Sequence, residues 1–300
     1  MLIRRRRWLL SGLPAALAGA SSWAAPLRPP RAPGGEPQPL HYPRHNKMPD
    51  PQQAYMVELL QLALGRGSKP YRLQALPMTM AQGRTMVEMA HGGNELDLMW
   101  TMTNREREAM GLIPVRIPVD RGLLGWRLML IRQADVPFWR KLRSLAELAP
   151  LVAGQGHDWP DAEVLRANGL NVGTSSSYEG LFRMLARGRI DYFPRSIMEV
   201  DAELAMHADE GLVIAPHVML YYPTASYYFL APQHAEAAEQ LRQGLEECLA
   251  DGSWDKLFQR HYSALLARHQ IAQRLVLRLS NPLLPEATPL QRKAFWLQPD

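Results

Sequence analysis

The sequence predicts an α/β protein of two lobes with a cleft between them. Segments with strand-like and helix-like patterns alternate along the chain, which is typical of parallel-rich sheets flanked by helices. Polar residues gather at predicted strand ends in both halves, at 100–107 and at 173–178 with 193–199. Two long β-rich connections, 117–131 and 220–230, enclose the second half. A chain that leaves one lobe, builds another and returns needs two such hinge crossings.

The first 25 residues have the pattern of an export signal. Four arginines at 4–7 precede an apolar run at 8–20, and small residues favour cleavage near Ala24 or Ala25. The apolar run is too short and too rich in Gly and Ser to span a bilayer. Both general secretory and twin-arginine export stay open. We expect the mature protein to be periplasmic.

Charge and cysteine content narrow the range of partners. The formal net charge of +5 falls to +1 once the four signal arginines are removed. The basic balance is therefore no indication of nucleic acid or of an acidic membrane surface. Cys248 is the only cysteine, so an intrachain disulfide is excluded and no cysteine follows the signal to carry a lipid. A free monomeric protein is expected.

Capping residues and glycines mark the elements of the first half. A proline-rich leader at 26–39 is expected to be extended. The elements that follow are a helix that begins at Asp50-Pro51 and ends at Gly65, a strand at 71–76, a helix that begins at a capping box from Thr79 and ends at Gly92, a strand at 96–100 and a helix that begins at a capping box from Thr103.

The second half repeats the alternation of strands and helices. Its expected elements are a short helix capped by Ser144, a strand at 151–153, a helix at 160–167, a βαβ unit at 171–193, a helix from a capping box at Ser196 to about 209, a strand at 212–215, and helices at 233–250 and 254–261. Because ligands bind beyond the carboxyl ends of strands in such sheets, the polar strand ends of both halves are candidate site segments.

The βαβ unit is the most informative stretch of the chain. Between its first strand and its helix lies a turn made almost entirely of hydroxyl residues, 173–177. Free backbone N–H groups and the positive end of the helix dipole meet there and favour an anion. Ser177 alone satisfies the need for a cap, so Thr174, Ser175 and Ser176 are predicted to contact a ligand.

These motifs, in this order, resemble the periplasmic solute-binding proteins of type II fold, the amino-acid-type receptors of ABC importers. The likeness covers residues 40–262 and is most specific at 249–262, which is similar to the closing helix pair of that family. The other matching stretches are TNRER at 103–107, GTSSSYEG at 173–180 and GRID at 188–191.

The chain is also similar to a divergent group of exported proteins described only as transporter-type substrate-binding domains. The matching stretches are QGR at 82–84, RGLLGWR at 121–127, DYFPR at 191–195 and NPLLP with TPL within 281–290. After the signal at 1–25 and the leader at 26–39, the expected division of the chain is lobe one at 40–121 and 226–265, lobe two at 122–225 and a C-terminal extension at 266–300.

The resemblance also indicates which residues would bind the carboxylate of the ligand. In the family an Arg at the start of a lobe-one helix and a Thr/Ser turn in lobe two hold the α-carboxylate of the ligand, and Arg107, with Thr174 and Ser175, matches those places. The fork of a guanidinium donates two parallel hydrogen bonds to a carboxylate. The family's lobe-two Asp, which receives the α-ammonium, is missing, and Arg195 stands in that region. A dianionic or non-amino carboxylate with Arg195 as a second cation is therefore plausible.

Other residues of the two candidate segments are weaker candidates. The further residues expected to contact the ligand are Trp100, Thr101, Thr103, Tyr42 and Tyr178. Each also has an ordinary structural explanation: Arg107 fits a solvated helix face, with Arg105 as the fallback, and the aromatic residues fit packing. The histidines lack metal-binding spacing, and the motifs of nucleotide sites and of common hydrolases do not occur in a credible setting. No metal or cofactor is expected.

The expected function is the binding of a small anionic, carboxylate-bearing solute, amino-acid-like or not, by closure of the cleft for ABC-type uptake. The partner would then be a membrane permease. One alternative is a sensory protein of the same fold that acts on a membrane sensor. The less favoured alternative is an enzyme such as a dehydratase or a cell-wall lyase, which needs a carboxylic acid in the cleft. Glu199 and Asp191 are the candidates for that acid.

Overall fold

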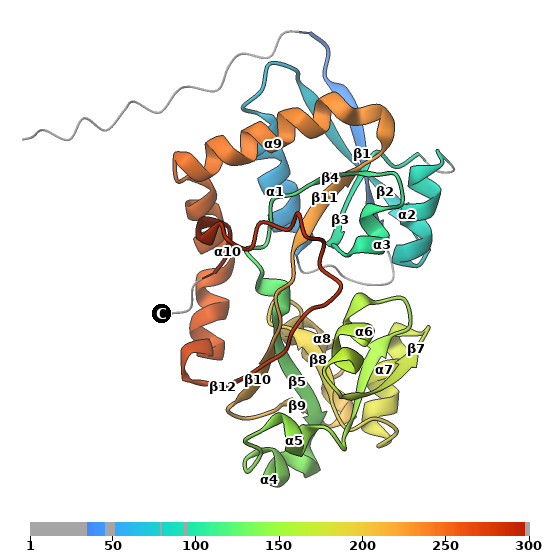
Figure 1. The fold of residues 1–300 in the computed structure, drawn as a ribbon, viewed down its shortest axis with the longest axis vertical. Coiled ribbons are helices and arrows are strands. Elements are labelled where there is room, and N and C mark those ends of the chain that lie inside the picture. Colours follow the sequence, from blue (N-terminus) through green and yellow to red (C-terminus); the bar gives the residue numbers. More distant parts are fainter. Residues whose placement is uncertain (1–34, 46–51, 79, 93–94, 298–300) are drawn as a thin grey trace, which may run out of the picture.

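The computed structural model describes residues 35–45, 52–78, 80–92 and 95–297. The predicted export signal, most of the leader, and the predicted capping residues Asp50, Pro51 and Thr79 lie outside these residues. The chain forms two lobes, which lie one above the other in Figure 1. Among the described residues, no helix combines the length and the apolar character needed to cross a membrane.

Lobe one contains two small sheets with helices packed around them (Figure 1). Strand β1 pairs with β2 in parallel, and β11 lies between β3 and β4, antiparallel to both. The strands are β1 (Gln38–His45), β2 (Tyr71–Met78), β3 (Leu98–Met102), β4 (Ile113–Val115) and β11 (Ser226–Leu230). The helices are α1 (Gln53–Leu64), α2 (Gln82–Ala90), α3 (Arg105–Glu108), α9 (Ala235–Ala250) and α10 (Ser253–His269).

Lobe two is built around β5, which pairs antiparallel with β8, β9 and β10. A separate parallel pair, β6 with β7, carries α6 and α7 on its flanks. The strands are β5 (Trp126–Arg132), β6 (Val152–Gly156), β7 (Asn171–Ser175), β8 (Phe193–Ser196), β9 (Leu212–Ile214) and β10 (Val218–Tyr221). The helices are α4 (Val136–Trp139), α5 (Leu145–Leu148), α6 (Pro160–Ala167), α7 (Tyr178–Ala186) and α8 (Val200–Met206).

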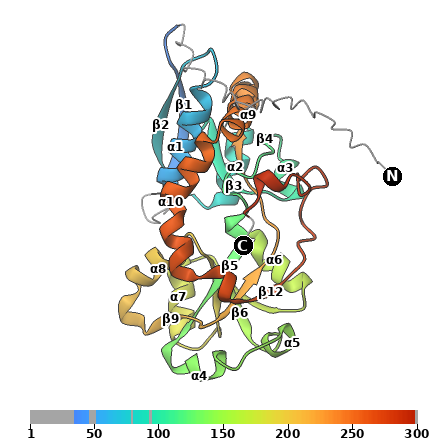
Figure 2. The same ribbon diagram turned by 90° about the vertical axis from the view of Figure 1, so that its left-hand side faces the viewer.

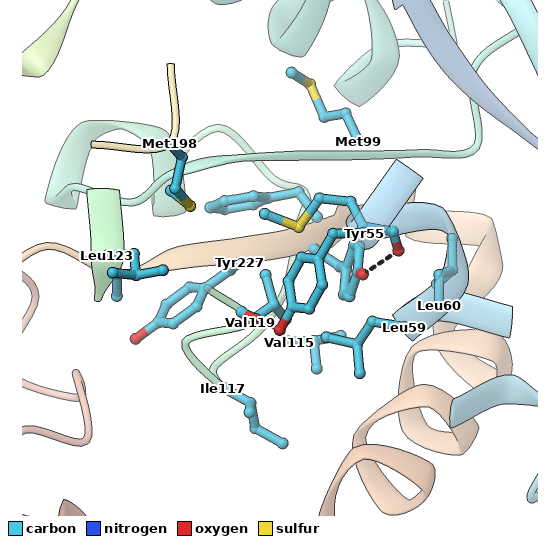
Figure 3. Packing of buried hydrophobic residues seen from close by; sticks show 14 of the residues in the cluster. Tyr55, Leu59, Leu60, Met99, Val115, Ile117, Val119, Leu123, Met198 and Tyr227 are labelled. Atoms are coloured by element: carbon cyan, nitrogen blue, oxygen red, sulfur yellow. Dashed lines mark hydrogen bonds between the residues drawn. The ribbon is translucent and has the colours of Figure 1, made fainter. Parts of the chain in front are cut away.

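The apolar face of α1 fixes the core of lobe one. Its buried residues recur every three or four positions, as an amphipathic helix requires, and Tyr55 and Leu59 are fully enclosed. Tyr55 also donates a hydrogen bond to the carbonyl of Val119, 2.7 Å away, in the first connection between the lobes. Figure 3 shows Val115 and Val119 close to these side chains, and Ile117 belongs to the same buried cluster. The first crossing is therefore anchored to the lobe-one core.

The predicted two-lobed α/β class is confirmed, and two details differ. Antiparallel pairs outnumber parallel ones, because β5 and β11, which enter from the crossings, run against their neighbours. The closing strand of the predicted βαβ unit at 190–193 is instead β8, shifted toward Ser196 and paired with β5, while only Tyr192 bridges to Ala153 of β6. Strand β1 also begins at Gln38, within the predicted leader.

The C-terminal segment adds two connections between the lobes. After α10, strand β12 (Leu275–Arg278) joins the lobe-two sheet beside β10. The chain then returns to lobe one, as the red trace in Figures 1 and 2 shows. There Arg292 is paired with Glu246 of α9, and the Leu297 N–H donates to the carbonyl of Arg121, 2.8 Å away. The segment predicted only as an extension thus joins both lobes.

A buried carboxylate shapes the first crossing. Asp120 is fully enclosed, and its two oxygens accept the N–H groups of Gly122 (3.1 Å) and Leu124 (2.9 Å). These bonds hold a turn in which Arg121 and Gly122 both have positive φ, 54° and 74°. Burial raises the pKa of Asp120 from 3.8 to about 6, although the backbone donors act in the opposite direction.

This pKa predicts a specific pH dependence of stability. Because the pKa of Asp120 is higher in the folded protein, its contribution to stability is fully present below about pH 4 and is lost as the pH rises through about 6. Relative to Asp120→Asn, the wild type is expected to lose up to about 3 kcal/mol of unfolding free energy across that interval. Urea unfolding of both proteins between pH 4 and pH 7 measures this, and a difference that stays constant with pH would contradict the assignment.

Candidate functional site

A cavity of about 480 Å³ lies between the lobes and is lined by residues of both. Lobe one contributes the end of β3 together with parts of α2 and α3, and lobe two contributes the loop after β6, the turn after β7, and segments around β8 and α8. Two contacts cross it: the Gly83 N–H faces Asp158 at 3.4 Å, and the Gln52 amide faces Glu199 at 3.5 Å. This cleft is where the predicted strand-end segments meet.

Within the described part of lobe one, Arg107 is the charged group that lines the cleft. The side chain of Asn104 accepts from the Arg107 N–H at 2.7 Å and begins the short helix α3, so Asn104 caps it in place of the predicted Thr103. The guanidinium, 3% exposed, donates to Thr101 Oγ1 (2.6 Å), the carbonyl of Met102 (2.8 Å) and Gln82 Oε1 (2.8 Å). All three acceptors are neutral.

Arg107 is therefore a buried cation without a bonded counter-ion among the described residues. Burial lowers the pKa of Arg107 to about 10, and the carboxylates of Asp158 and Asp161 act against that shift. The guanidinium is still protonated at neutral pH. A carboxylate that entered the cleft would supply the missing counter-charge.

Two carboxylates that follow β6, one in the loop and one at the start of α6, line the cleft. Asp161, in the first turn of α6, accepts from Arg127 Nη2 at 2.5 Å and from the hydroxyl of Tyr222. Asp158 has no arginine partner among the described residues; besides the Gly83 N–H, its neighbour is His157, 3.9 Å away. Asp158 is thus an acceptor on the lobe-two side that is open to a cationic group.

Arg195 has a different environment from the one predicted. It is 4% exposed and forms a forked pair with Glu203, with distances of 2.6 to 2.9 Å, and an ion pair with Glu199 at 3.0 Å. The hydroxyl of Tyr178 donates to the same Glu203 at 2.7 Å. Since two carboxylates already surround it, the positive charge of Arg195 is offset within the protein. The geometry disagrees with a role as a second cation for an anionic ligand.

The hydroxyl turn reaches the cleft through part of its length. Ser175 and Ser176 line the cavity, whereas Thr174 is exposed and does not. Strand β7 runs to Ser175, so Thr174 and Ser175 point to opposite faces of the β6–β7 pair. Ser177 caps α7 as predicted, accepting from the Gly180 N–H at 3.0 Å. Thr174 thus lies outside the cavity lining, and the ligand contacts of Ser175 and Ser176 stay predictions.

Of the remaining candidate residues, some line the cavity and others lie outside it. Trp100, Thr101 and Tyr178 line the cavity. Tyr42 lies outside the lining, packed on Trp100 with ring centres 5.6 Å apart. Thr103 is fully buried and donates to Glu108 at 2.8 Å.

The structure also shows where the alternative candidates Arg105, Asp191 and Glu199 lie. Arg105 is turned to the C-terminal segment, where it donates to the carbonyl of Pro282 at 2.6 Å. Asp191 lies away from the cleft and accepts from the backbone of Val152 at 2.8 Å. Glu199 does line the cavity, and its carboxylate accepts from the Ser196 N–H at 3.2 Å. Ser196 ends strand β8 and α8 begins only at Val200, so the helix start predicted at Ser196 is wrong.

Sequence reasoning missed several lining residues. Among them are Gln82, Arg127, Asp158, Trp159, Asp161 and Glu203. The rule that selected the other strand ends applies to β6 as well, but the predicted strand at 151–153 ended three residues before Gly156 and left the following loop out of view. Arg127 lay within the predicted hinge, in the RGLLGWR stretch.

Comparisons with known proteins bear on the fold. The sequence matches no protein-family model and no curated protein sequence. Solved structures do match. One is an ancestral arginine-binding protein bound to glutamine, with 15% sequence identity, a TM-score of 0.56, and a match over 76% of this chain and 99% of that one. Two others are the probable amino-acid ABC transporter extracellular-binding protein YtmK of Bacillus subtilis (14% identity, TM-score 0.56) and the GluR0 ligand-binding core in complex with L-glutamate (10% identity, TM-score 0.55), each matched over 76% of this chain and 98% of its own. These matches confirm the two-lobed fold of type II periplasmic binding proteins.

Proposed function

We propose that this chain is an exported binding protein whose lobes close on a small amino-acid-like solute. The observation that carries the proposal is Arg107, a buried guanidinium at the cleft whose bonded partners are all neutral. A carboxylate of the solute would receive two parallel hydrogen bonds from its fork. Closure would remove water from these bonds and strengthen them.

The second charged group of such a solute also has a place in the cleft. Asp158 carries a carboxylate without an arginine partner among the described residues, and it is one of the two cleft carboxylates that act on the pKa of Arg107. An α-ammonium held there and an α-carboxylate held by Arg107 describe a zwitterion. This favours an α-amino acid over the dianionic solute that the sequence suggested. Ser175 and Ser176 would add neutral donors to the carboxylate.

The solved structures of the same fold support this class of ligand. Those bound to glutamine and to L-glutamate hold α-amino acids, and YtmK is described as a probable amino-acid transporter protein. The basic and apolar pattern at 1–25 supports export to the periplasm. A membrane permease is the proposed partner, and a membrane sensor is the alternative for the same fold. Neither proposal requires catalysis.

A thermal-shift screen of the purified protein tests the proposal. The panel contains L-amino acids, dicarboxylates such as succinate, small peptides, and the amines agmatine and cadaverine, which are arginine and lysine without their α-carboxylates. At 100 times its dissociation constant, a ligand that binds only the folded state adds about 2.7 kcal/mol of stability. We expect one or more α-amino acids to raise the melting temperature and the amines not to. Responses to amines or to dicarboxylates alone would contradict the proposal.

A further inference from the structure

The charges that line the cleft do not balance. Among the described lining residues there are three guanidinium groups and four carboxylates. The guanidinium groups belong to Arg107, Arg127 and Arg195, and the carboxylates to Asp158, Asp161, Glu199 and Glu203. If Arg107 and Asp158 hold the two charges of an α-amino acid, as the proposed function states, the other five groups keep one uncompensated negative charge.

Those five groups form one chain of contacts. Glu203 and Glu199 both contact Arg195, and Glu199 also faces Arg127 at 3.9 Å. Arg127 in turn bonds Asp161 at 2.5 Å. Three carboxylates are therefore paired with only two guanidinium groups. The outer two carboxylates each have a close arginine contact, at 2.6 and 2.5 Å, whereas the middle one is shared.

Of the three carboxylates, Glu199 is the least neutralised by arginine and the most accessible to a ligand. Its contacts with arginine are the longest of the three, 3.0 and 3.9 Å, and its side chain is 20% exposed, against 4% for Glu203 and 9% for Asp161. Its other oxygen faces the Gln52 amide at 3.5 Å, a distance that leaves room for a stronger donor. Apolar and aromatic side chains, among them Met99, Met102 and Trp159, line the same cavity and suit an aliphatic chain.

Resting on the proposed function, we infer that the solute is a cationic amino acid, whose side-chain ammonium or guanidinium binds at Glu199. The α-carboxylate lies at Arg107 and the aliphatic part crosses the cavity. With this ligand bound, the positive and negative charges in the cleft are equal in number. A neutral side chain would leave a buried carboxylate without a full counter-charge, which is costly in a closed, dry site.

Protonation of Glu199, instead of a cationic ligand, would also remove the excess negative charge of the cleft. Burial raises the pKa of Glu199, while Arg195 and Arg127 lower it and Glu203 and Asp161 add to the rise. A protonated Glu199 would favour a neutral polar side chain, such as that of glutamine, over a cationic one. Ligand preference at neutral pH separates the two cases.

The test uses matched ligand pairs in isothermal titration calorimetry at pH 7: arginine with citrulline, and lysine with norleucine. A hydrogen bond to a charged group predicts a preference of about 10-fold or more for the cationic member of each pair. In Glu199→Gln the preference is expected to fall to about twofold or less, with citrulline bound about as tightly as by the wild type. Glu163→Gln, an exposed carboxylate of α6, is the control and should keep the wild-type preference.

Each outcome decides one claim. If the wild type binds citrulline or norleucine as tightly as the cationic partner, the inference about Glu199 is overturned and the proposed function stands. If neither pair nor any other amino acid binds, the proposed function fails as well. The preference of the wild type decides the inference even if Glu199→Gln does not fold. A preference that survives in folded Glu199→Gln would assign the cation to another carboxylate and overturn the role of Glu199.

Discussion

Replacing Arg107 with alanine is expected to weaken the binding of L-arginine by about 30-fold or more, because truncating one partner of a buried, hydrogen-bonded charge pair costs about 2–5 kcal/mol. The fold should survive the change. The groups that Arg107 contacts, Thr101, Met102 and Gln82, are neutral, so no unpaired charge is left behind in the absence of ligand. Calorimetric titration of the wild type and the variant measures the loss, and circular dichroism checks the fold.

Arg105→Ala is the matched control. Arg105 lies two residues earlier in the same short helix, but its guanidinium donates to the carbonyls of Pro282 and Leu284 rather than facing the cleft. We expect this variant to bind L-arginine within about twofold of the wild type. The assignment of Arg107 would be refuted if Arg107→Ala kept its affinity, or if Arg105→Ala lost as much.

Replacing Arg195 with alanine is expected to reduce the free energy of unfolding by about 3–5 kcal/mol, which is typical when one partner of a buried ion pair is removed. The variant would leave Glu203 and Glu199 close together with Tyr178 as the remaining donor to Glu203. This effect is on stability, with or without ligand. Urea unfolding followed by circular dichroism measures it.

Arg183→Ala serves as the control for Arg195. Arg183 is an exposed arginine of α7 in the same lobe, and its loss is expected to change stability by less than about 0.5 kcal/mol. If Arg195→Ala instead stayed as stable as the wild type and lost binding to the same degree as Arg107→Ala, Arg195 would be a ligand contact, as the sequence first suggested.

The sequence predicted the parts of the site that follow local rules. The strand-end rule selected the segment 100–107, which depends on a few neighbouring residues. Within that segment, the family resemblance pointed to Arg107. The cap of α7 by Ser177 depends only on the next turn. The alternation of strands and helices likewise predicted two lobes, because each element has its own periodic pattern.

The parts that depend on partners distant in sequence were not predicted. Pairing of β5 with β8, β9 and β10 is decided by how the crossings enter lobe two, which no local pattern specifies. The burial of Arg195 against Glu203 depends on how α8 packs over β8. One signal was available: Glu199 and Glu203 are four residues apart, a spacing that places both carboxylates on one helix face, where a single arginine can pair with both.

A crystal structure of the protein with the amino acid that most raises its melting temperature tests the central claim most directly. The account predicts that the α-carboxylate of the ligand lies within hydrogen-bond distance of both terminal nitrogens of Arg107, with the α-ammonium at Asp158. A ligand whose carboxylate is held elsewhere, or that binds outside the cleft between the lobes, would contradict it.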